Sequence, residues 1–451
     1  MKVALHNLGC KVNSYEMDVM SERLAEKGYS IVPFDEKADV YIINTCTVTN
    51  IADRKSRQML HRARKENPDA VVVAVGCYVE TGLSGVKKDP AIDLAIGNNK
   101  KSEIPEILDE FFAARKGMDS QDQWSSVDKT LNGATVVDIN HTDIYEEMKL
   151  TALPEHTRAY IKIQDGCNQF CTYCVIPYAR GRVRSRDEAD ILDEVRNLAA
   201  KGCREIVLTG IHVGSYGASA DGSGLVDLVE KLDDIDGIER IRLSSVEPRV
   251  MNEENVRRLA SVRKLCPHFH LSLQSGCDSV LKRMNRHYTS EEFKRSVELL
   301  RSSFDRPAIT TDVIVGFPGE TEGEFEECRR FVEDIAFYEM HVFKYSPRKG
   351  TVAAGMPDQL TDREKSRRSD VLLDITGRDS ARYREGFVGE SLCVLWEDEE
   401  VHDGIKYMTG HTDRYVRVAV PEGTAEYERA LTGSVTKVTP TDFLNNDTLR
   451  I

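Results

Sequence analysis

A strand followed by a helix recurs along most of this chain of 451 residues, and this alternation constrains the fold more than any other feature. From residue 157 onward, helical stretches such as EADILDEVRNLAAKG and EEFKRSVELLRSS separate apolar runs. These runs are AYIKIQD, EIVLTGI, RIRLSS, HFHLSLQ, AITTDVIVGF and MHVFKYS. Six such units of about 30–45 residues predict a partial parallel (β/α)6 barrel over 151–383, because a complete barrel has eight.

The segments on either side of this core differ from it. The first part, 1–117, alternates strands such as KVALHNLG, DVYIINTCT and AVVVAVGC with helices, which predicts an α/β doubly wound parallel sheet. Asn13 and Glu16 fit a capping box for its first helix. The acidic, polar stretch that follows predicts a linker at 118–150 with room for one hairpin. The short alternating strands of 384–451 predict a small all-β barrel of the oligonucleotide-binding kind.

The composition of the chain narrows the cellular compartment and the kinds of binding partner that we expect. No run of about 18 apolar residues is present, and the start, MKVALHNLGC, lacks the long apolar core of a signal peptide. We therefore expect a cytoplasmic protein without a membrane partner. Its eleven cysteines are then free thiols, metal ligands or catalytic groups rather than disulfides. The net charge of −14 argues against a globally basic nucleic-acid binder and against DNA as a partner, but not against local basic patches.

Three cysteines lie close together in DGCNQFCTYCVIPYARGRVRSR. Cys167, Cys171 and Cys174 form a Cys-x3-Cys-x2-Cys pattern with no fourth cysteine nearby. Structural zinc and most 4Fe-4S clusters use four protein ligands. A site with three protein ligands leaves one coordination position of the metal open, which indicates a reactive rather than a structural metal site.

A second set of three cysteines is dispersed along the first 80 residues. Cys10, Cys46 and Cys77 each stand at the carboxyl end of a predicted parallel strand. Such ends meet along one edge of a sheet, so these cysteines are expected to converge and to hold a second cluster with an open iron. The alternative is three buried thiols that pack as small hydrophobes. The remaining cysteines show no pattern and are interpreted as structural: Cys203, Cys266, Cys277, Cys328 and Cys393.

Two groups of basic and aromatic residues are candidates for RNA contacts. Arginines alternate directly after the local cysteine motif, at Arg180, Arg182, Arg184 and Arg186. In RYVRVAV, Tyr415 and Arg417 share one strand face, where a base could stack and a phosphate could pair, while Val416, Val418 and Val420 share the other. Half-exposed strands often carry Tyr and Arg without a ligand, so this second signal is weak alone.

These residues resemble a known family. The local cysteine motif, with Tyr173 before its last cysteine, resembles the radical S-adenosylmethionine (SAM) signature. The three-part organisation is similar to that of the methylthiotransferases, in which an N-terminal domain with three dispersed cysteines precedes the radical-SAM core and an RNA-binding TRAM domain ends the chain. The segments GCKVNSYEMD and NTCTVTNIADRKSRQ resemble those of the MtaB branch of this family. The MiaB branch typically has Gln-Met-Asn, and the RimO branch Pro-Lys-Asn, where this chain has Lys11, Val12 and Asn13.

The resemblance implies an enzyme that adds a methylthio group to C2 of N6-threonylcarbamoyladenosine at tRNA position 37. It implies two 4Fe-4S clusters, SAM as radical source and methyl donor, the anticodon stem-loop of tRNA as partner, an electron donor and a sulfur source. The C2–H bond is inert toward bases and nucleophiles, so radical chemistry from a cofactor is required. Candidate SAM contacts at strand ends are Tyr173, Thr209, Gly210, Ser245, Glu247, Gln274, Gly316 and Gly319.

Other functions stay open at this point. A family member could instead modify isopentenyladenosine in tRNA or an aspartate of a ribosomal protein. A non-catalytic iron–sulfur electron carrier or redox-sensing RNA-binding protein is disfavoured by the missing fourth cysteine, since carriers have fully ligated clusters. A zinc-bearing structural protein is the third alternative.

Overall fold

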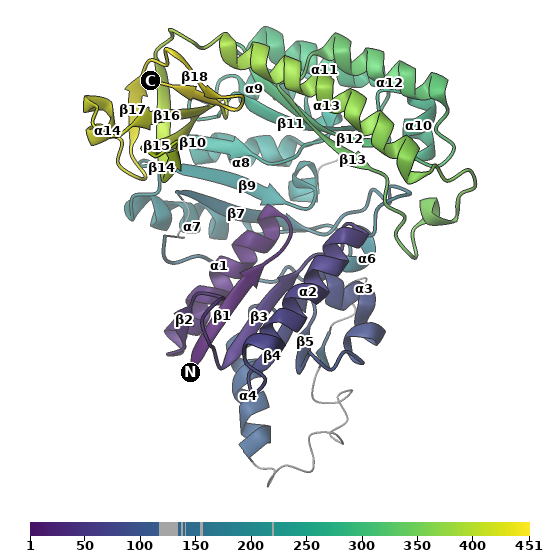
Figure 1. The fold of residues 1–451 in the computed structure, drawn as a ribbon, viewed down its shortest axis with the longest axis vertical. Coiled ribbons are helices and arrows are strands. Elements are labelled where there is room, and N and C mark those ends of the chain that lie inside the picture. The colour runs from purple at the N-terminus through teal and green to yellow at the C-terminus, as the bar shows by residue number, and fades with distance from the viewer. Residues whose placement is uncertain (117–133, 137–138, 140, 154–156, 219–220) are drawn as a thin grey trace.

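The computed structural model describes residues 1–116, 134–136, 139, 141–153, 157–218 and 221–451. The chain forms an N-terminal α/β part, a central α/β part and a C-terminal sheet, arranged so that the central part contacts both of the others (Figure 1). Within the described ranges, no helix is both long and apolar enough to cross a membrane.

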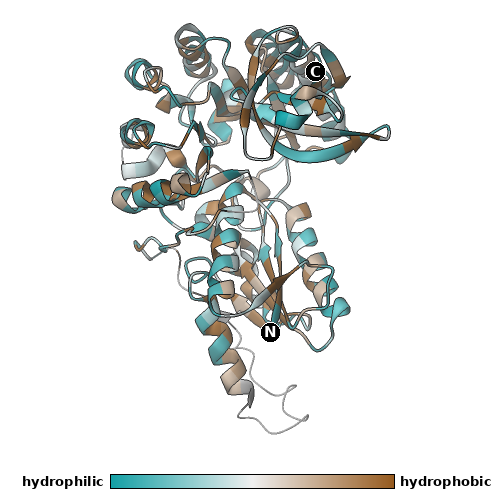
Figure 2. Cartoon of the chain, turned by 90° about the vertical axis from the view of Figure 1, so that its left-hand side faces the viewer, coloured by the Kyte–Doolittle hydropathy of each residue, from teal (hydrophilic) through white to brown (hydrophobic). Residues whose placement is uncertain are grey.

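The N-terminal sheet has the strand order β2-β1-β3-β4-β5-β6, and all neighbours pair in parallel. Its strands are β1 (Lys2–Asn7), β2 (Ser30–Val32), β3 (Val40–Thr45), β4 (Val71–Gly76), β5 (Leu94–Ile96) and β6 (Ala134–Thr135). Its helices are α1 (Lys11–Glu26), α2 (Asn50–Glu66), α3 (Cys77–Val86) and α4 (Ile104–Lys116). Every residue of β3 and β4 is buried, as expected for apolar strands between two helical layers. These strands are strongly hydrophobic, whereas the flanking helices are mixed (Figure 2).

Part of the expected linker belongs to the N-terminal sheet. β6 extends the sheet at β5, and Met148 and Leu150 are buried in the main core. Residues 117–133, which include the first half of the linker expected at 118–150, lie outside the described residues.

The predicted capping box at Asn13 is wrong. Helix α1 begins earlier, at Lys11, with Cys10 as the residue before it. Asn13 and Glu16 are both about 1% exposed, within the helix, where their side chains bind distant parts of the chain. The sequence spacing fits a cap, but burial against other segments overrides it.

The central part contains six parallel strands in chain order. β7 (Arg158–Asp165), β9 (Glu205–Gly210) and β10 (Arg240–Leu243) form one sheet, to which the short β8 (Arg184–Ser185) pairs antiparallel. β11 (His268–Gln274), β12 (Ala308–Val315) and β13 (Glu339–Lys344) form another. Two parallel bridges, Ile241 to Leu265 and Val246 to Leu271, connect the two sheets.

Helices surround these strands (Figure 1). They are α6 (Ile176–Arg180), α7 (Glu188–Ala200), α8 (Ser223–Asp233), α9 (Glu253–Leu259), α10 (Asp278–Arg283), α11 (Ser290–Ser303), α12 (Glu322–Ile335) and α13 (Asp362–Glu385). Alternate strand residues such as Phe269, Leu271, Ile309 and Val313 belong to the main hydrophobic core. The residues between them therefore point to the opposite, inner face of the strands.

The C-terminal sheet has the strand order β17-β14-β15-β16-β19-β18. Its elements are β14 (Leu392–His402), β15 (Ile405–Thr412), β16 (Arg417–Pro421), α14 (Ala425–Arg429), β17 (Val435–Val438), β18 (Asp442–Asn445) and β19 (Thr448–Arg450). Neighbours pair antiparallel except β16 and β19. Val416, Val418 and Val420 pack with Trp396 in a separate core, which confirms the predicted apolar face.

Candidate active site

The three dispersed cysteines meet at one edge of the N-terminal sheet. Cys10, Cys46 and Cys77 follow β1, β3 and β4, which are adjacent strands. A Cβ placed on Gly9 would lie 3.2 Å from Cβ of Cys46, so the loops after β1 and β3 touch. Burial raises the pKa of Cys46 to about 11, and the Cys77 and Cys10 thiols add to this shift. The three thiols are therefore close enough to influence one another.

This donor set fits a cluster with three protein ligands. All three side chains are free thiols, and metal binding would take them as thiolates. Gly9 and Gly76 have φ of +118° and +94°, and a Cβ on Gly76 would meet Oδ1 of Asn44 at 2.7 Å. Glycine is thus required directly before Cys10 and Cys77, where the backbone turns each cysteine onto the sheet edge.

Arg180 joins this edge to the central part. Its Nε donates to Sγ of Cys77 at 3.3 Å, and its Nη2 donates to Oδ1 of Asn13 at 2.6 Å. Its Nη1 donates to Oε1 of Glu16 at 2.7 Å and to Oδ2 of Asp165 at 3.1 Å. Since Arg180 ends helix α6, the element that follows the local cysteine motif, one guanidinium binds both parts of the protein.

A buried ion cluster surrounds this guanidinium. Glu16 also binds Lys101 and, at 2.8 Å, Lys162, while Asp165 lies 2.7 Å from Nζ of Lys162. Although burial alone would raise the pKa of Glu16, the charges of Arg180, Lys101 and Lys162 hold it well below its usual value. Because the carboxylates and cations are all deeply buried, each depends on the others for compensation.

The local cysteine motif occupies the tight loop between β7 and α6. The Cys167 N–H donates to the Gly181 carbonyl at 3.0 Å, and the Cys174 N–H donates to the Cys171 carbonyl at 2.9 Å. Gly166 has φ of +74°, and a Cβ there would lie 1.8 Å from the Arg182 carbonyl oxygen. The loop therefore holds its cysteines in a fixed fold that glycine makes possible.

The sulfurs of this loop lie in a shielded, partly cationic environment. Burial raises the pKa of Cys167 to about 11 and that of Cys174 to about 12, and the neighbouring Cys171 adds to both shifts. Nη1 of Arg286 donates to Sγ of Cys171 at 3.2 Å. Three thiols in one shielded loop fit the set that a 4Fe-4S cluster with one open iron requires.

Glu247 is a predicted SAM contact from outside this loop that borders it directly. It pairs with Arg286 at 2.9 Å and with His212 at 3.3 Å, and it accepts a hydrogen bond from Gln169 in the cysteine loop at 3.3 Å. A buried carboxylate thus lies beside the motif, and Arg286, His212 and Gln169 hold it there.

The other SAM candidates are distributed along the strand ends. Thr209 is buried at the end of β9, Gly210 is half-buried, and Ser245 is exposed after β10. Gln274 has φ of +68° at the end of β11, where the register with β12 shifts. Gly316 and Gly319 have φ of +71° and +70° after β12, and Tyr173 packs against the small core of Phe317 and Tyr345. Their contacts to SAM stay predictions.

The four alternating arginines do not form one surface. Arg180, Arg184 and Arg186 are 0%, 4% and 2% exposed. Arg184 donates to the carbonyl oxygens of Arg180 and Arg182, and Arg186 pairs with the buried Glu194. The expectation that these three contact RNA is not supported, because carboxylates and carbonyls of the protein already bind them. Arg182 is exposed, with its guanidinium 4.5 Å from the Phe170 ring centroid, and stays a candidate.

Tyr415, whose ring was expected to stack on an RNA base, packs against other side chains of the protein instead. Its ring stacks between His268 and His411, with centroid distances of 5.1 and 4.6 Å, and Arg158 and Arg242 lie 5.0 and 4.9 Å from its centroid. Its backbone has φ of +64°, before β16 begins, so it does not share a strand face with Arg417. Tyr415 instead attaches the C-terminal sheet to the central strands.

Arg417 lies on β16, half-buried, and pairs with Glu400 of β14. A phosphate would have to compete with this carboxylate for the guanidinium.

Several residues around the cysteines were not found from the sequence. Asn98 donates to the Ala179 carbonyl at 2.8 Å and lies 3.6 Å from Sγ of Cys77. Asp165, Gln169 and Arg286 were not singled out, and Glu16 was expected only as part of a helix cap. The contacts of Arg180 with Asp165 and Glu16 span 15 and 164 residues of sequence, so no local spacing could identify them.

Comparisons with known proteins agree with this arrangement. The model of the radical SAM superfamily matches residues 161–332, and that of uncharacterized protein family UPF0004 matches residues 2–97. The threonylcarbamoyladenosine tRNA methylthiotransferase MtaB of Bacillus subtilis is 39% identical over 97% of this chain and 93% of its own length. The chain belongs to the radical-SAM methylthiotransferase family.

Other members of the radical-SAM methylthiotransferases match at similar levels. The MtaB of Aquifex aeolicus is 40% identical over 88% of this chain and 93% of its own length. A tRNA-2-methylthio-N(6)-dimethylallyladenosine synthase of Carboxydothermus hydrogenoformans is 33% identical over 96% and 95%. The chain is therefore a radical-SAM enzyme, and membership implies a 4Fe-4S cluster and SAM. The resemblance predicted from the cysteine motifs is confirmed.

Solved structures support the fold of this methylthiotransferase. The radical SAM methyltransferase TsrM of Kitasatospora setae aligns with a TM-score of 0.55 at 19% identity, over 76% of this chain and 74% of its own. The shared feature is the α/β radical-SAM fold with its parallel sheets.

Proposed function

We propose that this methylthiotransferase adds a methylthio group to C2 of N6-threonylcarbamoyladenosine at tRNA position 37. A comparison of two groups of relatives supports the choice of nucleoside. The Bacillus, Aquifex and Thermotoga relatives whose names specify threonylcarbamoyladenosine are 36–40% identical to this chain. Those whose names specify dimethylallyladenosine are 33–35% identical.

Two clusters are part of this proposal. Cys167, Cys171 and Cys174 would hold the SAM-binding 4Fe-4S cluster, and Cys10, Cys46 and Cys77 would hold a second one that carries sulfur. When bound, such groups supply an electron to cleave SAM into a radical, and a site from which a methylthio group is transferred.

One observation carries the proposal: the hydrogen bond from Arg180 to Cys77. It connects the helix after the local motif with the edge that carries the dispersed cysteines. Both cysteine sets therefore flank one boundary between the N-terminal and central parts, as a transfer between two clusters requires.

The residues around the cysteines have positioning roles in this scheme. Arg180, Asn13 and Asn98 fix the sheet edge relative to helix α6. Arg286 and Glu247 hold the other loop, and Glu247 is a candidate for SAM because it borders the motif through Gln169. Cys171 is buried and Cys167 and Cys174 are half-buried, which limits the access of water to the radical chemistry.

The domains follow the same assignment. We assign 1–117 together with β6 to the methylthiotransferase N-terminal domain, the rest of 118–150 to a linker, 151–383 to a partial (β/α)6 barrel and 384–451 to an RNA-binding TRAM domain. The six parallel strands of the central part and the mostly antiparallel C-terminal sheet support these boundaries. The anticodon stem-loop, an electron donor and a sulfur source are the proposed partners, in the cytoplasm.

The test is nucleoside analysis after reaction in vitro. The reconstituted enzyme is incubated with SAM, a reductant and tRNA that bears either threonylcarbamoyladenosine or isopentenyladenosine. Mass spectrometry of the hydrolysed tRNA should show a methylthio product only from the first. A product only from the isopentenyl substrate would assign the chain to the other branch, and formation of neither product nor 5′-deoxyadenosine would exclude the proposed activity.

A further inference from the structure

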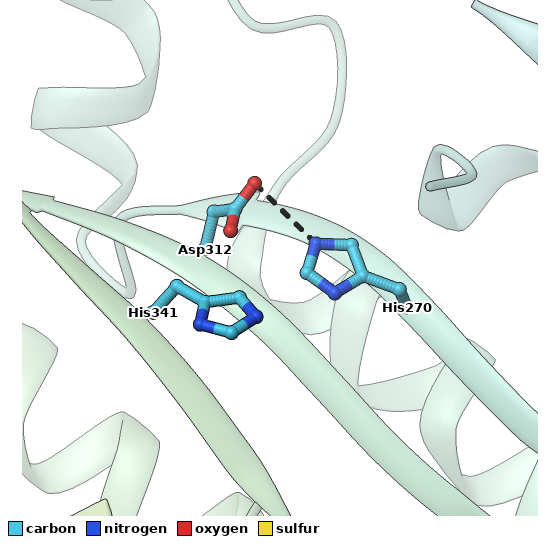
Figure 3. Close-up of side chains that lie close together, drawn as sticks. All are labelled: His270, Asp312 and His341. Carbon is cyan, nitrogen blue, oxygen red and sulfur yellow. Dashed lines mark ion pairs between the residues drawn. The ribbon is translucent and has the colours of Figure 1, made fainter. Parts of the chain in front are cut away.

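Three potential metal ligands converge on the inner face of the central strands, apart from both cysteine sets. His270 lies on β11, Asp312 on β12 and His341 on β13 (Figure 3). In the strand register, His270 pairs with Thr310, and Asp312 pairs with His341. Since residues two apart share a strand face, all of these side chains point to the same side.

Their ligand atoms lie at distances that suit one ion. One ligand atom from each of the three residues lies within 4.8 Å of the others. Nε2 of His270 is 3.3 Å from Oδ2 of Asp312. Two atoms bound at about 2.1 Å to the same metal are about 3.0–3.4 Å apart. The His270–Asp312 pair therefore already has the separation of neighbouring ligands.

The hydrogen bonds leave the metal-facing atom of His270 available. Nδ1 of His270 lies 3.0 Å from the Thr310 hydroxyl, which fixes the ring, whereas Nε2 is buried, makes no hydrogen bond and has only Oδ2 of Asp312, the other proposed ligand, at ion-pair distance. A metal-bound histidine commonly has its other nitrogen held in this way by a second group. The rings of His270 and His341 also stack loosely, with centroids 5.8 Å apart, so His341 faces the same space.

The exposure of the ligands indicates an open site. His270 and Asp312 are half-buried and His341 is exposed. Three protein ligands on one side of an ion leave positions for water or for the oxygen atoms of a ligand. Structural metal sites are closed, so this arrangement differs from them.

The site is also distinct from the clusters. His270, Asp312 and His341 precede the last residues of β11, β12 and β13 by four, three and three residues. At about 3.3 Å per residue, the ligands lie roughly 10–13 Å below the strand ends. None of the three residues contributes sulfur, so the chemistry differs from that of the cysteine sets.

We propose that His270, Asp312 and His341 bind one divalent transition-metal ion. Two imidazoles and one carboxylate suit ions such as Zn²⁺ and Fe²⁺, and disfavour Ca²⁺ and Mg²⁺, which prefer oxygen ligands. The site stands independently of the nucleoside that the enzyme modifies.

Zinc binding to the holoenzyme tests this proposal. The full chain is reconstituted with iron and sulfide until both cysteine sets are loaded, dialysed against Zn²⁺ and analysed for zinc and iron. We expect about one zinc per chain in the unmodified protein and only background zinc in His341→Ala and Asp312→Asn. His61→Ala is the matched control, because His61 also pairs with a single carboxylate, Asp89, at 3.0 Å, and should keep the zinc.

A direct readout separates loss of binding from loss of folding. His341 is exposed, so its replacement should leave the iron and sulfide content unchanged while zinc is lost. Anomalous diffraction at the zinc edge from soaked crystals should place the ion between the three side chains. Zinc retained by His341→Ala and Asp312→Asn, or an anomalous peak elsewhere, would overturn the proposal.

Discussion

Nε of Arg180 donates to Sγ of Cys77 at 3.3 Å, across the boundary between the central and N-terminal parts. The same guanidinium binds Glu16 and Asp165, which are buried. One side chain therefore links a proposed cluster ligand to a buried ion cluster, and its position depends on both parts of the chain.

Replacing Arg180 should destabilise the protein strongly. Arg180→Met leaves Glu16 and Asp165 with fewer compensating charges, and breaking a buried pair costs about 3–5 kcal/mol. Urea denaturation followed by circular dichroism measures the loss. Arg182→Met, two residues away and exposed, should change stability by less than about 0.5 kcal/mol. Equal effects of the two variants would show that the ion cluster is not needed for folding.

Arg182 should contribute to tRNA affinity through a phosphate. Arg182→Ala is expected to weaken tRNA binding and to reduce the slope of log K against log salt by about one unit. Fluorescence anisotropy at several salt concentrations measures both quantities. Lys88→Ala, which removes an exposed cation two residues after the end of α3, serves as the control. An unchanged slope for Arg182→Ala would remove this residue from the RNA interface.

Tyr415 should act in domain attachment rather than in base stacking. Tyr415→Ala removes a ring held between His268 and His411 and contacted by two arginines, which is worth about 2 kcal/mol. Limited proteolysis should then cut more quickly before residue 392, where β14 begins. If the variant keeps its protease resistance but loses tRNA affinity, the stacking role predicted from the sequence would be restored.

Glu205 should make stability depend on acid pH. Burial opposes its ionisation, but Arg242 and Arg158 together lower its pKa from 4.5 to about 2. A lowered folded-state pKa gives stability that is complete above about pH 4.5 and is lost as pH falls toward 2. Between pH 4.5 and 3 the unmodified protein should lose about 1–2 kcal/mol more than Glu205→Gln. Parallel pH profiles in urea denaturation would contradict this assignment.

The convergence of Cys10, Cys46 and Cys77 could be predicted because each follows a strand of a parallel sheet. Apolar strands that alternate with helices determine the sheet, and the sheet determines where their ends meet. The local motif could be identified without any prediction of the fold, because its three cysteines belong to one loop. These two features follow from short-range patterns and were accessible from the sequence.

The arginine run shows where such patterns fail. An alternating spacing of arginines does not distinguish side chains that reach solvent from side chains that bind buried carboxylates. Arg180 binds Glu16 and Arg186 binds Glu194, and both carboxylates come from other helices. Likewise, His270, Asp312 and His341 come from three strands and form no motif along the chain. Only the register of the strands brings them together.

The most direct test of the account counts acid-labile sulfide and iron after reconstitution. The account predicts two 4Fe-4S clusters, so sulfide should fall from about eight to about four per chain in the triple Cys→Ala variant of Cys10, Cys46 and Cys77. The triple variant of Cys167, Cys171 and Cys174 should lose the same amount, and a mononuclear ion at the histidines would not contribute sulfide. If the first variant keeps about eight sulfides per chain, the dispersed cysteines hold no cluster and the central claim is wrong.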